Sequence, residues 1–275
     1  MSRTFYLFRG CLIPTRLPFL ERSSIFVLDK MKVHYEPLPG ATCCVEPIGL
    51  RSLAVDTWLV AAARLLSIAE ENDRDILTLC NGCLMSLKEA KHALKSQKIR
   101  DRVNEVLAGI GRRYTGKTEI IHLVDLIAKR RTALDELVVK RGTGMRVAIH
   151  PGCHLVRPTK LTSYDQSYYT RALSEIASSL GAEVVAEEDW PNCCGGGVSN
   201  VNEVLSSKVL DELIDEFATA GANCILTPCP FCFVQFDLRQ KRGMPVLYFS
   251  EFLALALGAS SEEIGLRYHK TKVVV

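Results

Sequence analysis

Ten of the eleven cysteines follow one pattern that is written twice along the 275-residue chain. Each copy has a lone cysteine, an adjacent pair and a Cys-x-x-Cys motif: Cys11, Cys43-Cys44 and Cys80/Cys83 in the first half, then Cys153, Cys193-Cys194 and Cys229/Cys232 in the second. Matching groups are separated by 142 residues (11 to 153), 150 residues (43 to 193) and 149 residues (80 to 229). These separations indicate duplication of one ancestral half and predict two metal-cluster sites, with function where the halves meet.

The five thiols of each half suit a metal cluster better than a single zinc ion. Structural zinc takes four ligands, usually from two Cys-x-x-Cys motifs, and each half has only one. Adjacent residues of an extended chain point to opposite sides, so Cys43 and Cys44 are poorly placed to bind one small ion. In an iron-sulfur cluster, neighbouring thiolates can bind different irons. Five ligands exceed the four of an ordinary cubane, which leaves an unusual cluster or one spare thiol per site as alternatives.

The elements that must position these thiols alternate between strands and helices. In the first half we expect strands over Thr4–Phe8, Val33–Glu36 and Ile76–Leu79, and helices over Ser24–Met31, Leu53–Glu70 and Leu84–Leu94. In the second half the same order gives strands over Arg146–Ile149, Val184–Val185, Cys224–Thr227 and Val246–Tyr248, and helices over Tyr168–Leu180, Val201–Ala220 and Glu251–Leu257.

This alternation predicts an α/β fold with two pseudo-symmetric Rossmann-like domains, each a small, mostly parallel sheet flanked by helices. Every cysteine group lies just after an expected strand, so the thiols should converge at the carboxyl edge of each sheet. Between the halves, helices are expected over Lys98–Leu107 and Glu119–Leu134. We place the boundary near Gly142, which gives an N-terminal cluster-binding domain over residues 1–142 and a C-terminal one over residues 143–275.

Composition limits the classes of function. No apolar stretch is long and uncharged enough to span a bilayer, and the first 20 residues lack the apolar core of a secretory signal, so we expect a cytoplasmic protein. Thiols stay reduced in that compartment, which favours metal or redox chemistry over disulfides. A net charge of +3 without a basic stripe argues against nucleic acid and fits a small anionic ligand.

The spacing Cys-x31-Cys-Cys-x35-Cys-x-x-Cys, followed by Cys-x39-Cys-Cys-x34-Cys-x-x-Cys, resembles the duplicated cysteine-rich CCG domain of the B-type subunit of heterodisulfide reductase. The surroundings of the cysteines are also similar to that family, as in Pro39–Cys44, Leu79–Cys83, Gly152–His154, Cys229–Cys232 and the tail Leu253–Gly258. The resemblance covers nearly the whole chain.

The resemblance implies two non-cubane [4Fe-4S] clusters, one held by Cys11, Cys43, Cys44, Cys80 and Cys83 and the other by Cys153, Cys193, Cys194, Cys229 and Cys232. It implies a disulfide oxidoreductase that acts in methanogenesis on the disulfide of coenzyme M and coenzyme B, bound between the clusters. The paired clusters would supply two electrons and one iron for each sulfur. Electrons would come from a ferredoxin-like iron-sulfur subunit of the C type and a flavin-containing subunit of the A type.

Several other residues have a functional and a structural interpretation. His154 is a candidate proton donor to a product thiolate, or a group that orients the cysteine loop. Four basic residues are candidates for binding anionic groups of the substrate or are solvated surface charges: Arg9, Arg16, Arg157 and Lys160. The run Gly195–Gly197 favours close approach of backbone to cluster sulfur over a phosphate cradle. Cys224, outside the repeat, is expected in the core.

Three alternatives to this function stay open. A variant of the family serves sulfur oxidation, with a lipoate-bound or other sulfur species as substrate. Cysteine-rich domains also occur in electron-relay subunits of other oxidoreductases, although a relay needs only one cluster and neither copy here has lost a cysteine. A structural zinc protein is the third alternative.

Overall fold

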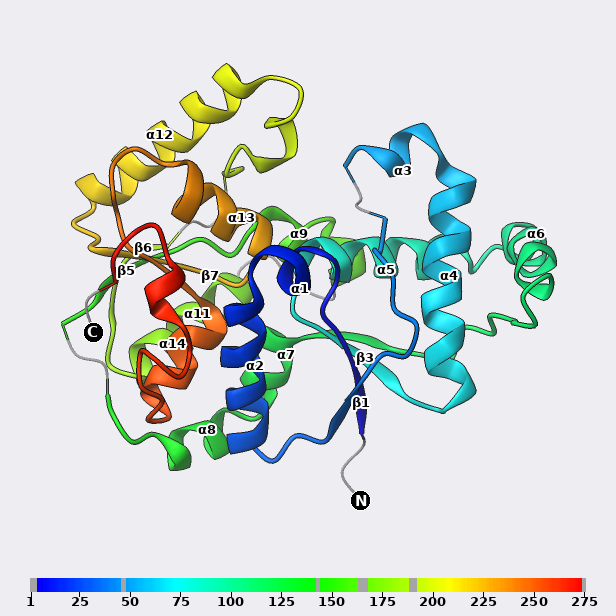
Figure 1. Ribbon diagram of the computed structural model, residues 1–275, viewed down its shortest axis with the longest axis horizontal. Coiled ribbons are helices and arrows are strands. Elements are labelled where there is room, and N and C mark those ends of the chain that lie inside the picture. The colour runs from blue at the N-terminus through cyan, green and yellow to red at the C-terminus, as the bar shows by residue number, and fades with distance from the viewer. Residues whose placement is uncertain (1–3, 46–47, 142–143, 163–167, 188–191, 274–275) are drawn as a thin grey trace.

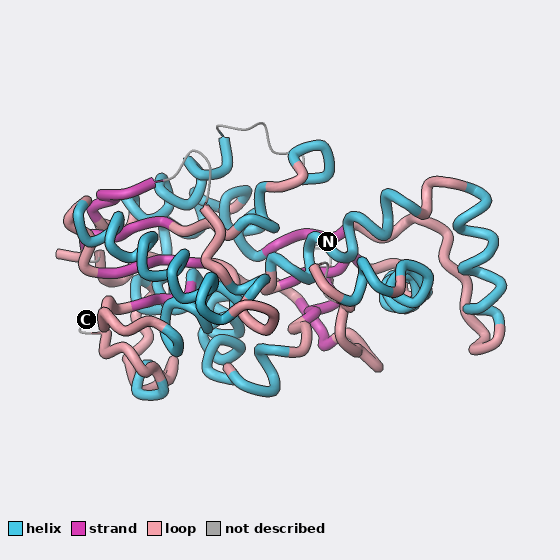
Figure 2. Tube along the Cα trace, turned by 90° about the horizontal axis from the view of Figure 1, so that it is seen from above, coloured by secondary structure: helices cyan, strands magenta, loops and turns pink. Residues whose placement is uncertain are grey.

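Two four-stranded parallel sheets form the centre of the computed structural model, which describes residues 4–45, 48–141, 144–162, 168–187 and 192–273. The first sheet has the order β2 (Tyr35–Pro37), β1 (Phe5–Phe8), β3 (Asp75–Thr78) and β4 (Ile120–His122). The second has the equivalent order β6 (Glu183–Glu187), β5 (Arg146–Ile149), β7 (Cys224–Thr227) and β8 (Val246–Tyr248). Figure 2 shows the two groups of strands side by side. The α/β architecture predicted from the alternation of strands and helices is confirmed.

Helices cover the sheets, whose inner strands are buried on both faces. Those of the first half are α1 (Leu12–Arg16), α2 (Pro18–Lys30), α3 (Leu50–Leu53), α4 (Val55–Glu71), α5 (Asn81–Ala93), α6 (Gln97–Ala108), α7 (Leu123–Lys129) and α8 (Arg131–Leu137). Those of the second are α9 (Cys153–Val156), α10 (Thr159–Thr162), α11 (Tyr168–Ser179), α12 (Glu203–Thr219), α13 (Pro230–Val234) and α14 (Phe249–Ala256). Short turns are η1 (Gly196–Val198), η2 (Gln235–Arg239, π-helical) and η3 (Leu266–Tyr268).

Packing drives this layering. All four residues of β1, β3 and β7 are buried, as parallel strands covered by helices on both faces require. The long helices α4 and α12 turn their apolar faces inward, with Leu65 and Leu66 of α4 and Ile214 of α12 completely buried. The resulting core runs continuously through both halves.

Three of the expected elements differ in the structure. The single helix expected over Glu119–Leu134 is wrong, because Ile120–His122 pairs with β3 and two helices, α7 and α8, follow. His122 ends the strand by capping α7, since its Nδ1 accepts from the Val124 amide at 3.2 Å. The helix expected from Ser24 begins earlier, at Pro18, and the expected strand Val33–Glu36 lies at Tyr35–Pro37 on a sheet edge, where proline is tolerated.

Each half packs one of its helices against a helix of the other half. In Figure 1, α14 of the second half lies against α2 of the first. Ser250 of α14 is 2.7 Å from Ser23 and accepts from Ser24 at 3.0 Å, and all three side chains are buried. The equivalent helix of the first half, α7, packs on α11 of the second. The two sheets are therefore joined by reciprocal helix packing.

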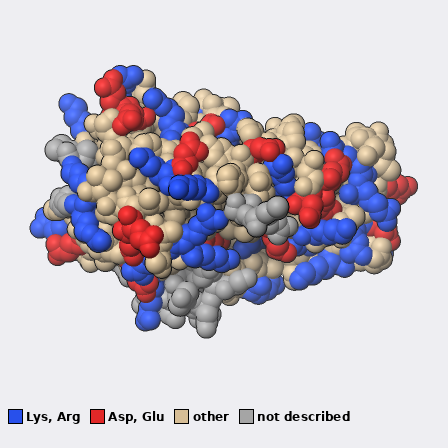
Figure 3. All heavy atoms as spheres, turned by 90° about the horizontal axis from the view of Figure 1, so that it is seen from below, with Lys and Arg blue, Asp and Glu red and all other residues tan. Residues whose placement is uncertain are grey.

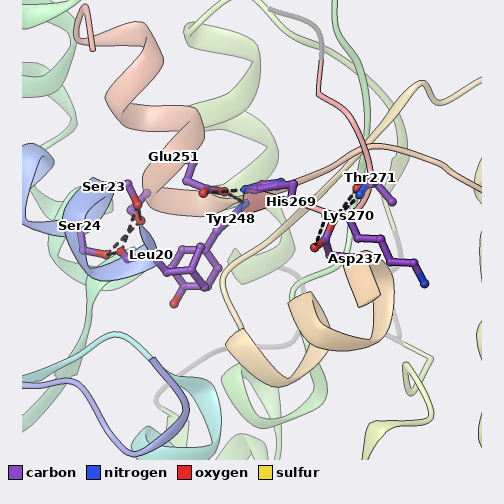
Figure 4. A network of polar contacts seen from close by, with 10 residues as sticks. Leu20, Ser23, Ser24, Asp237, Tyr248, Glu251, His269, Lys270 and Thr271 are labelled. Carbon is purple, nitrogen blue, oxygen red and sulfur yellow. Dashed lines mark hydrogen bonds and ion pairs between the residues drawn. The ribbon is translucent and has the colours of Figure 1, made fainter. Parts of the chain in front are cut away.

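A polar network, shown in Figure 4, fixes the C-terminal segment. His269 Nε2 lies 2.9 Å from Oε1 of Glu251, and both side chains are buried. Asp237 accepts hydrogen bonds from the backbone amides of Lys270 and Thr271 at 3.0 and 2.9 Å. The chain end is thereby held on α14 and η2.

The distribution of charge on the surface agrees with the small net charge of +3. On the face shown in Figure 3, Lys and Arg side chains are intermixed with Asp and Glu. No helix among the described residues is long and apolar enough to cross a membrane. The expected domain boundary at Gly142 lies outside the described residues.

Candidate metal-cluster site

Each cysteine group follows a strand, so the sheet topology brings the thiols together. Cys11 follows β1 and caps α1, and Cys80 follows β3 and caps α5. In the second half, Cys153 begins α9 after β5, and Cys229 caps α13 after β7. The pairs come in the loops after the edge strands β2 and β6.

All ten repeated cysteines line one cavity between the halves. Residues of α1, α9 and α13 line this cavity, and Figure 1 shows these three helices near the middle of the molecule. The lining cysteines are Cys11, Cys43, Cys44, Cys80, Cys83, Cys153, Cys193, Cys194, Cys229 and Cys232. Ile48 and Phe231 also line the cavity, and both are substantially exposed, so they form an apolar rim. The structure thus places both cysteine sets around a common space.

The thiols contact one another without disulfide bonds. Cys43 Sγ lies 3.7 Å from Cys11 Sγ in the first half, and Cys194 Sγ lies 3.3 Å from Cys232 Sγ in the second. Both separations far exceed a covalent S–S bond of about 2.05 Å. None of the cysteines in the described part of the chain forms a disulfide bond, so the thiols of both sets can act as metal ligands.

The thiols also interact between the halves. The pKa of Cys80 lies well below its usual value, first because the Cys229 thiol hydrogen-bonds to it and then because Cys83 does. Cys193 is similar: hydrogen bonds from Cys153 and Cys194 and from the amides of Gly195 and Gly197 lower its pKa to about 2. Each set therefore has one thiol that favours thiolate, the form that binds metal, whereas hydrogen bonds from neighbouring thiols and burial raise the pKa of others such as Cys83 and Cys153.

Two glycines let the loops of the lone cysteines approach the Cys-x-x-Cys thiols. Gly10 precedes Cys11 with φ +69°, and a Cβ there would lie 2.7 Å from Cys83 Sγ. Gly152 precedes Cys153 with φ +76°, and a Cβ there would lie 3.4 Å from Cys232 Sγ and 2.6 Å from Asn81 Nδ2. The same left-handed turn therefore recurs in both halves.

The residue after each cysteine pair has a left-handed backbone. Gly195 follows Cys193-Cys194 with φ +78°, whereas Val45 follows Cys43-Cys44 with φ +57°. A β-branched residue rarely adopts this conformation, so the first loop has local strain that the second avoids. The two loops thus share a shape despite their different sequences. Within the glycine run, a Cβ on Gly196 would come 3.4 Å from Cys194 Sγ, so the backbone at Gly196 lies close to this thiol.

A second cavity, of about 530 Å³, opens beside the first. Cys153 and His154 line both cavities, so the two spaces adjoin at α9. Arg51 and Arg157 also line the second cavity, and Arg51 is ion-paired with Glu89. Its size suits a small-molecule arm, and its lining of two arginines and one glutamate, Glu89, leaves a net positive charge that suits an anion.

The other candidate residues lie in different surroundings. Arg9 lines the cysteine cavity, where it pairs with Glu21 at 2.8 Å. Arg16 and Lys160 are exposed and line neither of the two cavities. Cys224 is buried on β7, where burial raises the pKa of its thiol to about 12.

Sequence reasoning missed four residues near the cavities: Asn81, His150, Tyr248 and Arg51. Asn81 donates to the Pro151 carbonyl at 2.7 Å, and the Tyr248 hydroxyl donates to the Leu79 carbonyl, so both join the halves. His150 is completely buried, and burial lowers its pKa to about 4. The available signal was position, since Asn81 lies inside a Cys-x-x-Cys motif and His150 ends the strand before Cys153.

The sequence of this chain is similar to those of known proteins with cysteine-rich domains. The family described as "Cysteine-rich domain" (CCG) matches twice, over residues 5–88 and 147–237. The B-type subunit of the ferredoxin/F(420)H(2)-dependent CoB-CoM heterodisulfide reductase of Methanosarcina acetivorans is 35% identical over 274 residues, which covers 94% of this chain and 91% of that protein. The chain belongs to the family of heterodisulfide reductase B-type subunits. The CCG motifs of this family suggest iron-sulfur clusters, and the ten converging thiols fit such a group.

The family also includes a relative with a different name. The 8-methylmenaquinol:fumarate reductase membrane anchor subunit of Wolinella succinogenes is 30% identical over 285 residues, covering 98% of this chain and 97% of that protein. Among solved structures, a hypothetical protein from Helicobacter pylori superposes with a TM-score of 0.77 at 18% identity. The superposition covers 100% of this chain and 53% of the Helicobacter pylori protein. This likeness shows the fold.

Proposed function

We propose that this chain is the catalytic subunit of a heterodisulfide reductase-type complex, which reductively cleaves, or reversibly forms, a disulfide like that of coenzyme M and coenzyme B. In this proposal each half, residues 1–142 and 143–275, holds one non-cubane [4Fe-4S] cluster through its five cysteines. The observation that carries the proposal is that both cysteine sets line one cavity. A substrate placed there lies between two redox sites rather than beside one.

The reaction consumes two electrons and two protons: the S–S bond breaks, and each sulfur leaves as a thiolate that is then protonated. When bound, the clusters would supply one electron each and a cation for each thiolate. The chain itself supplies the apolar rim of Ile48 and Phe231, which limits water at the reacting bond.

His154 and the two arginines have defined tasks in this proposal. His154 lines both cavities, so it can deliver a proton to a product thiolate at the junction. Arg51 and Arg157 line the second cavity, where they can hold an anionic group on one arm of the disulfide. The reacting sulfurs would lie among the cysteines while the arm extends past α9.

Electrons have to enter from partners, since the described residues contain no cysteine cluster besides the two sets. A ferredoxin-like subunit of the C type and a flavin subunit of the A type complete the proposed complex, in the cytoplasm. The relative from Methanosarcina acetivorans, which is itself named as a part of a heterodisulfide reductase, supports this assignment.

The direct test is a viologen-linked reduction assay on the assembled complex with a panel of disulfides. Turnover of an anionic heterodisulfide, with loss of activity in Cys44→Ala and Cys193→Ala, would support the proposal. Full activity in either variant would refute the role of that cysteine pair. Turnover only with lipoate-bound or other oxidised sulfur species would instead indicate the sulfur-oxidation variant of the family.

A second candidate function is an electron relay in another oxidoreductase, favoured by the relative from Wolinella succinogenes. No disulfide turnover despite full clusters would favour the relay. Iron and acid-labile sulfide analysis separates both functions from a zinc protein. We expect about eight irons per chain with matching sulfide, whereas about two zincs without sulfide would exclude clusters.

A further inference from the structure

His150 is a buried imidazole at the end of a central strand. It follows β5, and its backbone amide donates to the Leu226 carbonyl of β7 at 2.9 Å, so its position is fixed by the sheet. Neither Nδ1 nor Nε2 has a hydrogen-bond partner among the described residues. Leaving a buried polar atom without a hydrogen bond is unfavourable, which indicates that a further group belongs beside this ring.

The ring is held beside two of the cysteines. One ring nitrogen of His150, Cys194 Sγ and Cys232 Sγ all lie within 4.8 Å of one another. Phe236 packs edge-on against the imidazole, with ring centroids 4.9 Å apart and planes at 77°. Because the aromatic contact fixes the ring, the nitrogen is presented to the second cysteine set.

The first half has no such group at the equivalent position. His150 stands two residues before Gly152 and three before Cys153, and Phe8 has the same relation to Gly10 and Cys11. Phe8 is also completely buried. A phenyl ring cannot donate a hydrogen bond, so the two sites differ by one donor despite their matching cysteines.

We propose that the N–H of His150 donates a hydrogen bond to sulfur of the C-terminal cluster and raises its reduction potential above that of the N-terminal cluster. This inference rests on the proposed function, because it needs clusters in both halves. A donor to cluster sulfur stabilises the reduced, more negative form. The half already offers five thiolates, so the imidazole is not needed as a metal ligand. The C-terminal cluster then accepts electrons first.

The test compares His150→Phe, which copies Phe8, with the cluster-loaded wild-type complex. In an EPR-monitored redox titration we expect one cluster potential to fall by at least a tenfold change in the one-electron equilibrium, about 59 mV, while the other stays unchanged. His150→Gln keeps an N–H donor and should recover part of the shift. His92→Phe, an exposed histidine of α5, is the control and should change neither potential.

Labelling with ¹⁵N-histidine gives a second measurement, in which a weak hyperfine coupling to one cluster should vanish in His150→Phe. Unchanged potentials in both His150 variants would overturn the inference. Loss of about half the iron in both would overturn it as well, because it would make His150 a ligand. Absence of iron and sulfide in the wild-type complex would instead refute the proposed function.

Discussion

The Asn81 amide of the first half donates to the Pro151 carbonyl of the second half at 2.7 Å. Asn81 lies between Cys80 and Cys83, and Pro151 lies two residues before Cys153. This one hydrogen bond therefore joins the Cys-x-x-Cys loop of one cysteine set to the lone-cysteine loop of the other. At the position equivalent to Asn81, the second half has Pro230, so the symmetry is broken here.

Replacing Asn81 by alanine should destabilise the contact between the halves. Asn81 is completely buried, and its loss leaves the Pro151 carbonyl without this donor, so we expect the free energy of unfolding to fall by about 1–3 kcal/mol. Anaerobic denaturant unfolding of the cluster-loaded protein measures this. Asn72→Ala, at the exposed end of α4, is the control, and we expect a change within about 0.5 kcal/mol. Equal changes in the two variants would contradict the assignment.

Gly195→Ala should lose metal from the second site. Its Cβ would lie 2.6 Å from the Ser206 carbonyl oxygen, so the loop that carries Cys193-Cys194 has to move. Gly221→Ala is a matched control, because Gly221 has φ +85° but no atom within 4 Å of a Cβ. We expect about half the iron in the first variant and full iron in the second, which loses only about 1–2 kcal/mol of stability through its left-handed backbone. Full iron in Gly195→Ala would show that the loop tolerates the shift.

Arg157→Gln should weaken the binding of anionic disulfides. A lost charge-assisted hydrogen bond corresponds to roughly a tenfold rise in KM, with kcat little changed because the reacting sulfurs lie elsewhere. Steady-state kinetics of the complex with an anionic and an uncharged disulfide measure the difference. Lys160→Gln, which lies outside both cavities, should change neither constant. The same loss for charged and uncharged disulfides would argue against an anion site.

Acid should destabilise the protein through His122. Burial and then Lys88 lower its pKa from 6.5 to about 3, so between these values the unfolded chain binds a proton that the folded chain does not. The stabilising contribution is present above pH 6.5 and is lost as the pH falls, by up to about 1.4 kcal/mol per pH unit. Asp125, whose pKa burial raises to about 6, changes stability in the opposite sense.

His122→Asn isolates this contribution, because asparagine can still cap α7 while Asp125 is retained. We expect the variant to lose less stability than the wild type between about pH 7 and pH 5 in denaturant titrations. Parallel pH profiles for the two proteins would assign the acid sensitivity to other groups.

The spacing of apolar residues and the positions of glycine and proline predicted most of the fold. Strands that end at a cysteine in a turn leave a strong local pattern in the sequence. The errors came where tertiary contacts decide: Ile120–His122 is helical in pattern but joins β3 as a strand. Convergence of the cysteines on strand ends was predictable from parallel topology. The partners of Asn81 and His150 were not, since they depend on how one half packs on the other.

The reciprocal packing of α14 on α2 and of α7 on α11 bears on the origin of the chain. In each half, the helix that follows the fourth strand packs on the helix that follows the first strand of the other half, which is the self-complementary contact of a two-fold symmetric pair. A single half would leave that helix uncovered. The ancestor of this chain is therefore best described as a homodimer whose two copies were later joined by gene fusion, after which His150 and Phe8 were free to diverge.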